Sequence, residues 1–115
     1  MPSTTLYKKW DLVLVSFPFT DFTADKRRPA LVISPDSYNV GQDITIAFVT
    51  SQSSAQRKVG DYEIEHWRQA GLVKASIVRM KFATIDKSIV VKTLGELAVG
   101  DRLKLEKCLL AFFGS

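Results

Sequence analysis

The chain has 115 residues, of which 46% are hydrophobic and 24% charged, a composition typical of a single globular domain spanning residues 1–115. One cysteine and one histidine exclude a disulfide framework and a zinc site built from several such ligands. The net charge of +4 favours polyanionic partners such as nucleic acid without requiring one. The polar N-terminus and the lack of an apolar run of about 18 residues lead us to expect a cytoplasmic protein with no membrane partner.

Three apolar segments in the first half predict β-strands. Residues 11–17 (DLVLVSF) are rich in valine, leucine and phenylalanine, and Pro18 prevents this strand from continuing as an inner strand. A polar loop at 20–26 leads to a second strand at 29–34. Turn residues at 35–41 then precede a third strand at 44–49.

The second half predicts shorter strands and one firm helix. In chain order we expect a polar loop at 51–60, a short strand at 61–64, a helical turn at 65–70 ended by Gly71, and strands at 76–82 and 88–93. From Val99 onward, Val99, Leu103, Leu110 and Phe113 recur on one helical face, and Gly114 marks the stop. The pattern predicts a mainly β fold, as a small barrel or a strongly bent sheet, with a C-terminal helix.

A basic cluster, Lys26-Arg27-Arg28, runs directly into the strand that Pro29 opens. Arginine is permanently charged and can grip two phosphate oxygens at once, and the proline biases Arg28 toward an extended backbone. We interpret the segment as an anion-holding site, although a solvated basic turn accounts for the same pattern equally well.

Two further polar sets follow later strands. Thr50, Ser51 and Gln52 end the third strand, and Arg79 and Lys81 alternate along a later one, so that their side chains share a face. If these strands are neighbours of the strand after Arg28, the three segments would converge around one phosphate. Taken alone, Arg79 is more typical of a solvated charge on a sheet face.

Familiar catalytic sets are otherwise missing. His66 is more typical of a surface or packing residue than of a base, and Cys108 of a small buried thiol in a helix. Glu63 and Glu65 share a strand face, but no partner motif supports glycosidase or metal chemistry.

Several segments together resemble one known family. Residues 10–20 (WDLVLVSFPFT), followed after a loop by Arg27 and by residues 28–34 (RPALVIS), resemble the MazF/PemK toxins in order and spacing. The resemblance continues through residues 46–52, 83–87 and 94–97 and the terminal helix, and so spans nearly the whole chain.

The resemblance implies an SH3-like barrel of about five to seven strands with a C-terminal helix, assembled as a homodimer. It also implies the toxin of a type II toxin–antitoxin system, a metal-independent and cofactor-independent endoribonuclease that cuts single-stranded RNA at short sequence motifs. A cognate antitoxin protein would restrain it, and it would contact DNA only through the antitoxin complex.

The resemblance also assigns residues. Arg28 and Thr50 match the catalytic arginine and threonine of the family. The expected substrate-binding residues are Lys26, Arg27, Ser51, Gln52, Arg79 and Lys81. In the reaction that the resemblance implies, the ribose 2′-OH would attack the adjacent phosphate while Arg28 stabilises the phosphorane. Thr50 would bind a phosphate oxygen, and Arg79 would form a second clamp.

Three positions depart from the family pattern. Trp10-Asp11 replaces the usual Gly-Asp, Thr23 stands where many relatives have an acidic residue, and Lys81 stands where some have aspartate. The last two leave the general base open. Two alternatives therefore remain: a non-catalytic toxin of the same fold that binds a topoisomerase or nucleic acid, and a toxin that has lost its activity.

Overall fold

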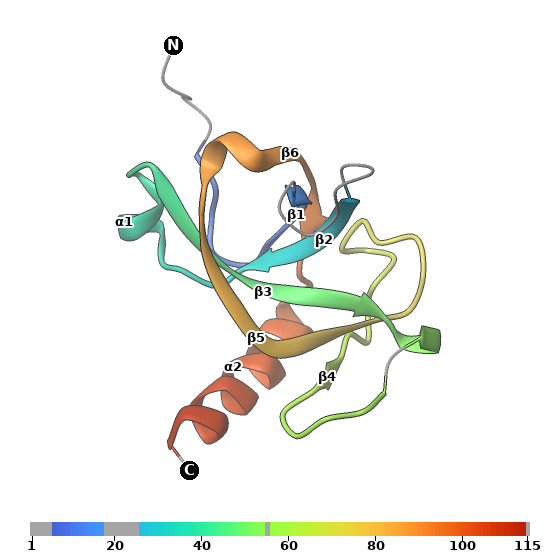
Figure 1. The fold of residues 1–115 in the computed structure, drawn as a ribbon. Helices are drawn as coiled ribbons and strands as arrows, with labels where there is room; N and C mark the ends of the chain where they lie inside the picture. The colour runs from blue at the N-terminus through green and yellow to red at the C-terminus, as the bar shows by residue number, and fades with distance from the viewer. Residues whose placement is uncertain (1–5, 18–25, 55, 115) are drawn as a thin grey trace.

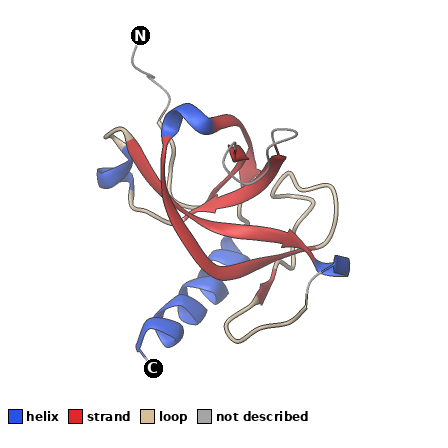
Figure 2. Cartoon of the chain, in the orientation of Figure 1, coloured by secondary structure: helices blue, strands red, loops and turns tan. Residues whose placement is uncertain are grey.

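The computed structural model describes residues 6–17, 26–54 and 56–114 (Figure 1). In chain order the elements are β1 (Asp11–Phe17), β2 (Lys26–Val32), α1 (Asp36–Asn39), β3 (Asp43–Ser51), the 3₁₀ turn η1 (Gln52–Ser54), β4 (Tyr62–Glu63), β5 (Ser76–Asp86), the 3₁₀ turn η2 (Lys87–Ile89), β6 (Val90–Glu96) and α2 (Val99–Gly114). The mainly β fold with a C-terminal helix is confirmed (Figure 2). None of the described helices is long and apolar enough to cross a membrane.

The six strands form one antiparallel sheet in the order β4-β5-β3-β2-β1-β6. The first strand has the predicted bounds, whereas β2 begins at Lys26 and ends at Val32, earlier than the predicted 29–34. Lys26 and Arg27 are therefore strand residues that pair with Phe17 and Ser16, not loop residues. The fifth strand runs on to Asp86, beyond its predicted end at residue 82, and the 3₁₀ turn η2 follows it.

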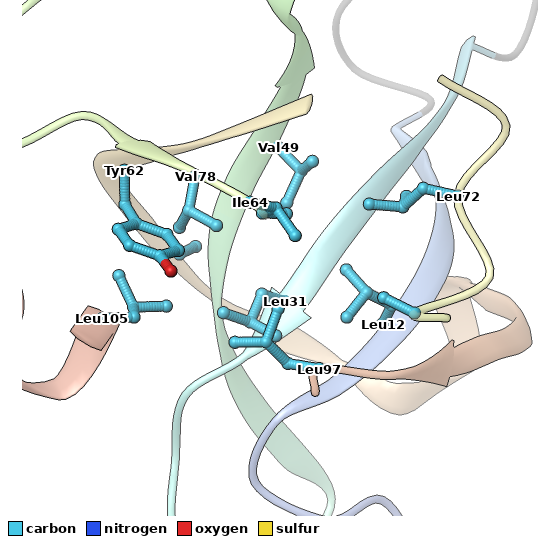
Figure 3. Close-up of a cluster of buried hydrophobic side chains, with 11 residues drawn as sticks. Leu12, Leu31, Val49, Tyr62, Ile64, Leu72, Val78, Leu97 and Leu105 are labelled. Atoms are coloured by element: carbon cyan, nitrogen blue, oxygen red, sulfur yellow. The ribbon is translucent and has the colours of Figure 1, made fainter. Parts of the chain in front are cut away.

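Both faces of the sheet are buried over its middle strands. On one face, Leu12 and Leu31 belong to a core that also contacts α2 through Leu105 (Figure 3). The alternating residues Val13 and Ala30 belong to a second core on the other face. Burial on both faces explains why residues 11–17 read as a continuous apolar run instead of an alternating one.

No strand ladder joins β6 to β4 among the described residues; a turn segment approaches β6 instead. Gly71 has φ +86°, and a Cβ at this position would lie 2.2 Å from the carbonyl oxygen of Leu94. A Cβ on Gly95 would lie 2.4 Å from the carbonyl oxygen of Ala70. The two backbones touch only because both residues are glycine. The sheet is thus barrel-like in curvature, and the turn at 66–71 covers its β6 edge.

A buried carboxylate ties α2 to the segment after β4. The Oδ1 atom of Asp101 accepts hydrogen bonds from the Tyr62 hydroxyl and, at 2.9 Å, from the Glu65 N–H, and Oδ2 accepts one from the His66 N–H at 2.9 Å. Burial, together with the hydrogen bond to Asp101, raises the pKa of the Tyr62 hydroxyl well above its ordinary value. These bonds hold the start of the helix against the sheet.

The predicted apolar face of α2 is the face that the protomer leaves exposed. Leu110 and Phe113 are 69% and 65% exposed, and Val99 and Leu103 are similarly open. Leu105, Cys108 and Leu109 supply the contacts with the core instead.

Candidate active site

Three neighbouring strands, β2, β3 and β5, bring Arg28, Thr50 and Arg79 to one surface hollow. A cavity of about 280 Å³ is lined by Arg28, Phe48, Val49, Thr50, Gln56, Lys58, Arg79 and Lys81. An adjoining cavity of about 240 Å³ is lined by Arg28, Pro29, Val49, Thr50, Ser51, Leu72, Val73, Lys74 and Ser76. The two cavities share Arg28, Val49 and Thr50, and we refer to both together as the cationic groove.

Strand register explains how Arg28 meets Thr50. The β2–β3 ladder pairs Val32 with Ile46 and Ala30 with Phe48. Two residues further along each strand, in continuation of this register, Arg28 lies across from Thr50. Both then lie on the sheet face that buries the core of Ala30 and Val32. The cavity of about 280 Å³ is the polar end of an otherwise apolar face.

An irregularity in β5 supplies the second arginine. The β3–β5 register shifts between Ala47, which pairs with Phe82, and Val49, which pairs with Val78. Phe48 on β3 therefore faces the three residues 79–81 on β5. Such a bulge increases local twist and re-aims side chains. Arg79 and Lys81 both line the groove, as their alternation predicted.

Ionic and aromatic contacts hold these two cations. The Arg79 Nη1 atom lies 3.4 Å from the Oδ2 atom of Asp61, and the Arg79 side chain is only 17% exposed. The Lys81 Nζ atom lies 5.1 Å from the centre of the Phe48 ring, which is a cation–π distance. Arg28 is exposed on the same groove. The groove thus combines an ordered guanidinium with an exposed one.

Some predicted residues lie elsewhere. Arg27 and Lys26 line neither cavity, and because neighbours on a strand point to opposite faces, Arg27 is turned away from Arg28. Gln52 lines a different cavity, of about 330 Å³, together with Tyr62 and Lys104. Ser51 lies in the groove as expected.

Sequence reasoning missed four residues at or behind the groove: Gln56, Lys58, Lys74 and Asp61. Lys58 lies in a segment that reads only as a polar loop, and Lys74 in a turn before β5. Gly60, at φ +88°, marks a tight turn beside Lys58, but nothing local indicates which surface that turn joins.

None of the described residues that line the groove is Asp, Glu or His. His66 instead lines a separate cavity of about 460 Å³ beside Glu96 and Arg102. Thr23, and the Asp21 and Asp25 that flank it, fall outside the described residues. Within the described part of the chain, no group of three or more His, Cys, Asp or Glu side chains is arranged to hold a metal ion.

A sequence model of the PemK-like, MazF-like toxins of type II toxin–antitoxin systems matches residues 8–113. The chain belongs to this family. It is therefore the toxin component of a type II toxin–antitoxin system. No curated protein matches it significantly in sequence.

Solved structures with the same fold carry related names. An endoribonuclease in complex with its cognate antitoxin from Mycobacterial species superposes with a TM-score of 0.74 at 13% identity, covering 94% of this toxin and 95% of that chain. The MazF of a MazE–MazF complex from Deinococcus radiodurans gives 0.73 at 24% identity, covering 96% and 98%. The Mycobacterium tuberculosis toxin MazF-mt6 gives 0.71 at 16% identity, covering 90% and 96%. At these identities the likeness establishes the fold, which extends over the whole length of the relatives.

Proposed function

We propose that this toxin is a metal-independent endoribonuclease that cleaves single-stranded RNA at short sequence motifs in the cationic groove. One observation carries the proposal: Arg28, Thr50 and Arg79 line one cavity. Positioned cations and a hydroxyl donor are what a phosphate that gains negative charge in a transition state requires. The endoribonucleases among the structural neighbours support the same assignment.

The nucleophile belongs to the RNA. The 2′-oxygen forms a bond to the adjacent phosphorus as its proton leaves, and the bond from phosphorus to the 5′-oxygen breaks as that oxygen takes up a proton. The products are a 2′,3′-cyclic phosphate and a 5′-OH end. The protein orients the backbone for in-line attack and stabilises the phosphorane, tasks in which electrostatics dominates.

Roles follow from position in the groove. Arg28, exposed at the surface, contacts the non-bridging phosphate oxygens. Thr50 donates a hydrogen bond to one of these oxygens, and Arg79 clamps the phosphate from β5. Lys58, Lys74 and Lys81 bind flanking phosphates, together with Ser51. Lys26, Arg27 and Gln52 contact only RNA that extends beyond the groove.

An unpaired strand suits this site better than a duplex. A shallow surface groove can take a splayed backbone whose bases are free to be read, whereas an A-form helix hides its base edges. We place the activity in the cytoplasm, where such transcripts are found.

The partners follow from the fold family and from the exposed face of α2. We propose that a cognate antitoxin binds this toxin, as antitoxins do in the structures of the mycobacterial endoribonuclease and of Deinococcus MazF, and that DNA is reached only through that complex. We further propose a homodimer that buries Val99, Leu103, Leu110 and Phe113, since side chains this apolar are costly to leave in water.

The decisive experiment incubates the purified toxin with single-stranded RNA in EDTA and determines the chemistry of the fragment ends. Cleavage with 5′-OH and 2′,3′-cyclic phosphate ends, abolished by Arg28→Ala, is expected. Sequencing the ends gives the recognised motif. Tight binding that leaves the RNA intact would support a non-catalytic binding toxin instead, the function favoured by a groove without a described carboxylate or imidazole.

A further inference from the structure

Asp61 lies directly behind the second arginine of the groove. The β4–β5 ladder pairs Glu63 with Ile77 and Tyr62 with Val78, so that Asp61 continues the register opposite Arg79. The Oδ2 atom of Asp61 and the Nη1 atom of Arg79 are 3.4 Å apart. The Asp61 side chain is only 4% exposed, which excludes direct contact with a bound RNA.

The same carboxylate also orders the turn that carries Lys58. Its Oδ2 atom accepts a hydrogen bond from the Lys58 N–H at 2.9 Å, and the Asp61 N–H donates to the Lys58 carbonyl at 3.1 Å. Gly60 between them has φ +88° and lies against Met80 and Phe112. One oxygen atom therefore connects two segments that each place a cation, Lys58 or Arg79, in the groove.

The two oxygen atoms of Asp61 have unequal surroundings. Among the described residues, Oδ1 is the buried side-chain atom without a hydrogen-bond partner. An unpaired buried carboxylate oxygen is costly, and the pairing of Oδ2 with Arg79 and with the Lys58 N–H offsets that cost. What an amide cannot supply is a negative charge fixed beside a guanidinium.

We infer that Asp61 is a positioning residue for RNA cleavage, which holds the Arg79 guanidinium in the orientation that stabilises the phosphorane. The inference rests on the proposed endoribonuclease function. A guanidinium that already points at the scissile phosphate needs no reorganisation during the reaction, whereas a loose one must be ordered in every turnover. Asp61 thus acts through Arg79 and touches no reacting atom.

The test is the Asp61→Asn variant, which keeps the size of the side chain and an acceptor for the Lys58 N–H but removes the charge. We expect the cleavage rate at saturating RNA to fall about tenfold or more, because transition-state stabilisation is lost. Binding of an RNA with a 2′-deoxy nucleotide at the cleavage position should change less than about threefold, because the cation itself remains.

A double-mutant cycle separates positioning from a general structural effect. If Asp61 acts through Arg79, the double variant Asp61→Asn/Arg79→Ala cleaves no more slowly than Arg79→Ala alone. Multiplicative losses, or an Asp61→Asn variant as fast as the parent, would overturn the inference. If the Asp61→Asn variant does not fold, Asp61→Ser takes its place. It removes the same charge with a smaller side chain, and its cleavage rate is compared with those of the parent and of Arg79→Ala in the same way.

Glu63→Gln is the matched control. It removes an equal charge two residues away on β4, where Glu63 is exposed and paired with Arg57, and should leave the rate unchanged.

A readout independent of cleavage distinguishes this inference from the proposed function. Hydrogen exchange of the Arg79 Nε–H, followed by NMR, should be slow in the parent and in Glu63→Gln and faster in Asp61→Asn. If the parent toxin does not cleave RNA, the proposed function fails while this comparison still tests the ion pair. Equal exchange in all three proteins would refute the positioning role.

Discussion

Arg28 and Thr50 belong to segments more than twenty positions apart, yet strand pairing places them across from each other at the polar end of one sheet face. Each side chain has a distinct task in the proposed reaction. The guanidinium supplies a positive charge, and the hydroxyl supplies a directed hydrogen bond. Replacing the Thr50 hydroxyl alone separates its contribution to the cleavage rate from that of Arg28.

Thr50→Val replaces that hydroxyl by a methyl group of nearly the same size. We expect the single-turnover cleavage rate to fall about 10- to 100-fold, since one donor to the developing charge is lost. Thr84→Val is the control, because the Thr84 hydroxyl bonds to that of Thr45 at 2.7 Å and Thr84 lines neither cavity of the groove. An undiminished rate in Thr50→Val would remove the hydroxyl from the mechanism.

At the scale of elements, two contacts cover the sheet. The 66–71 turn lies against β6, and α2 packs on one sheet face while its other side stays exposed. The turn covers one edge of the sheet from within the protomer. The helix packs on the sheet through Leu105 and leaves its more regular apolar face open. The contact of the turn with β6 stabilises the fold, and the exposed apolar face of α2 is available to a partner.

Gly71→Ala should destabilise the toxin by at least about 2 kcal/mol, because the new Cβ would sit in a left-handed conformation and against a carbonyl oxygen. Gly100→Ala is the matched control, because a Cβ there meets nothing within 4 Å. Alanine in a helix should increase the free energy of unfolding by about 0.5 kcal/mol relative to glycine. Urea denaturation of both variants measures the difference. Equal stability of the two would contradict the close approach of the turn to β6.

The exposed face of α2 predicts the oligomeric state. The parent should be a dimer at micromolar concentration in size-exclusion chromatography with light scattering. Leu110→Glu/Phe113→Glu should be a folded monomer, because a buried carboxylate without a partner is costly. Val40→Glu, at another exposed apolar position following α1, should remain dimeric. A monomeric parent would contradict the proposed interface.

At the scale of the whole molecule, positive charge is concentrated at the cationic groove. The net charge is only +4. Among the described residues, five cationic side chains from four segments nevertheless line the two cavities of the groove: Arg28, Lys58, Lys74, Arg79 and Lys81. Such a cluster attracts a polyanion more strongly than the modest net charge indicates.

Binding of a non-cleavable single-stranded RNA should therefore weaken steeply with salt. With about three or four cations on phosphates, the slope of log K against log salt concentration should be about −2 to −3. Lys58→Ala should make that slope less negative by about 0.7, whereas Lys92→Ala, on β6 and outside the groove, should leave it unchanged. A salt-independent affinity would show that phosphates are not the main contact.

The local features of this toxin follow from short stretches of its sequence. The bounds of β1, the start of α2 at Val99 and the shared face of Arg79 and Lys81 all follow from periodicities that neighbouring residues impose on one another. The family resemblance added the pairing of Arg28 with Thr50 as a functional unit. Such features need no knowledge of distant contacts.

Which segments lie side by side follows from the three-dimensional fold alone. The strand order places β2, β3 and β5 side by side, turns Arg27 and Gln52 away from the groove, and brings in Lys58, Lys74 and the buried Asp61. It also leaves exposed the helical face that the apolar pattern singled out. The physical reason is that strand pairing, bulges and turns join residues far apart along the chain, and the free energy of those contacts is not written in any short stretch of sequence.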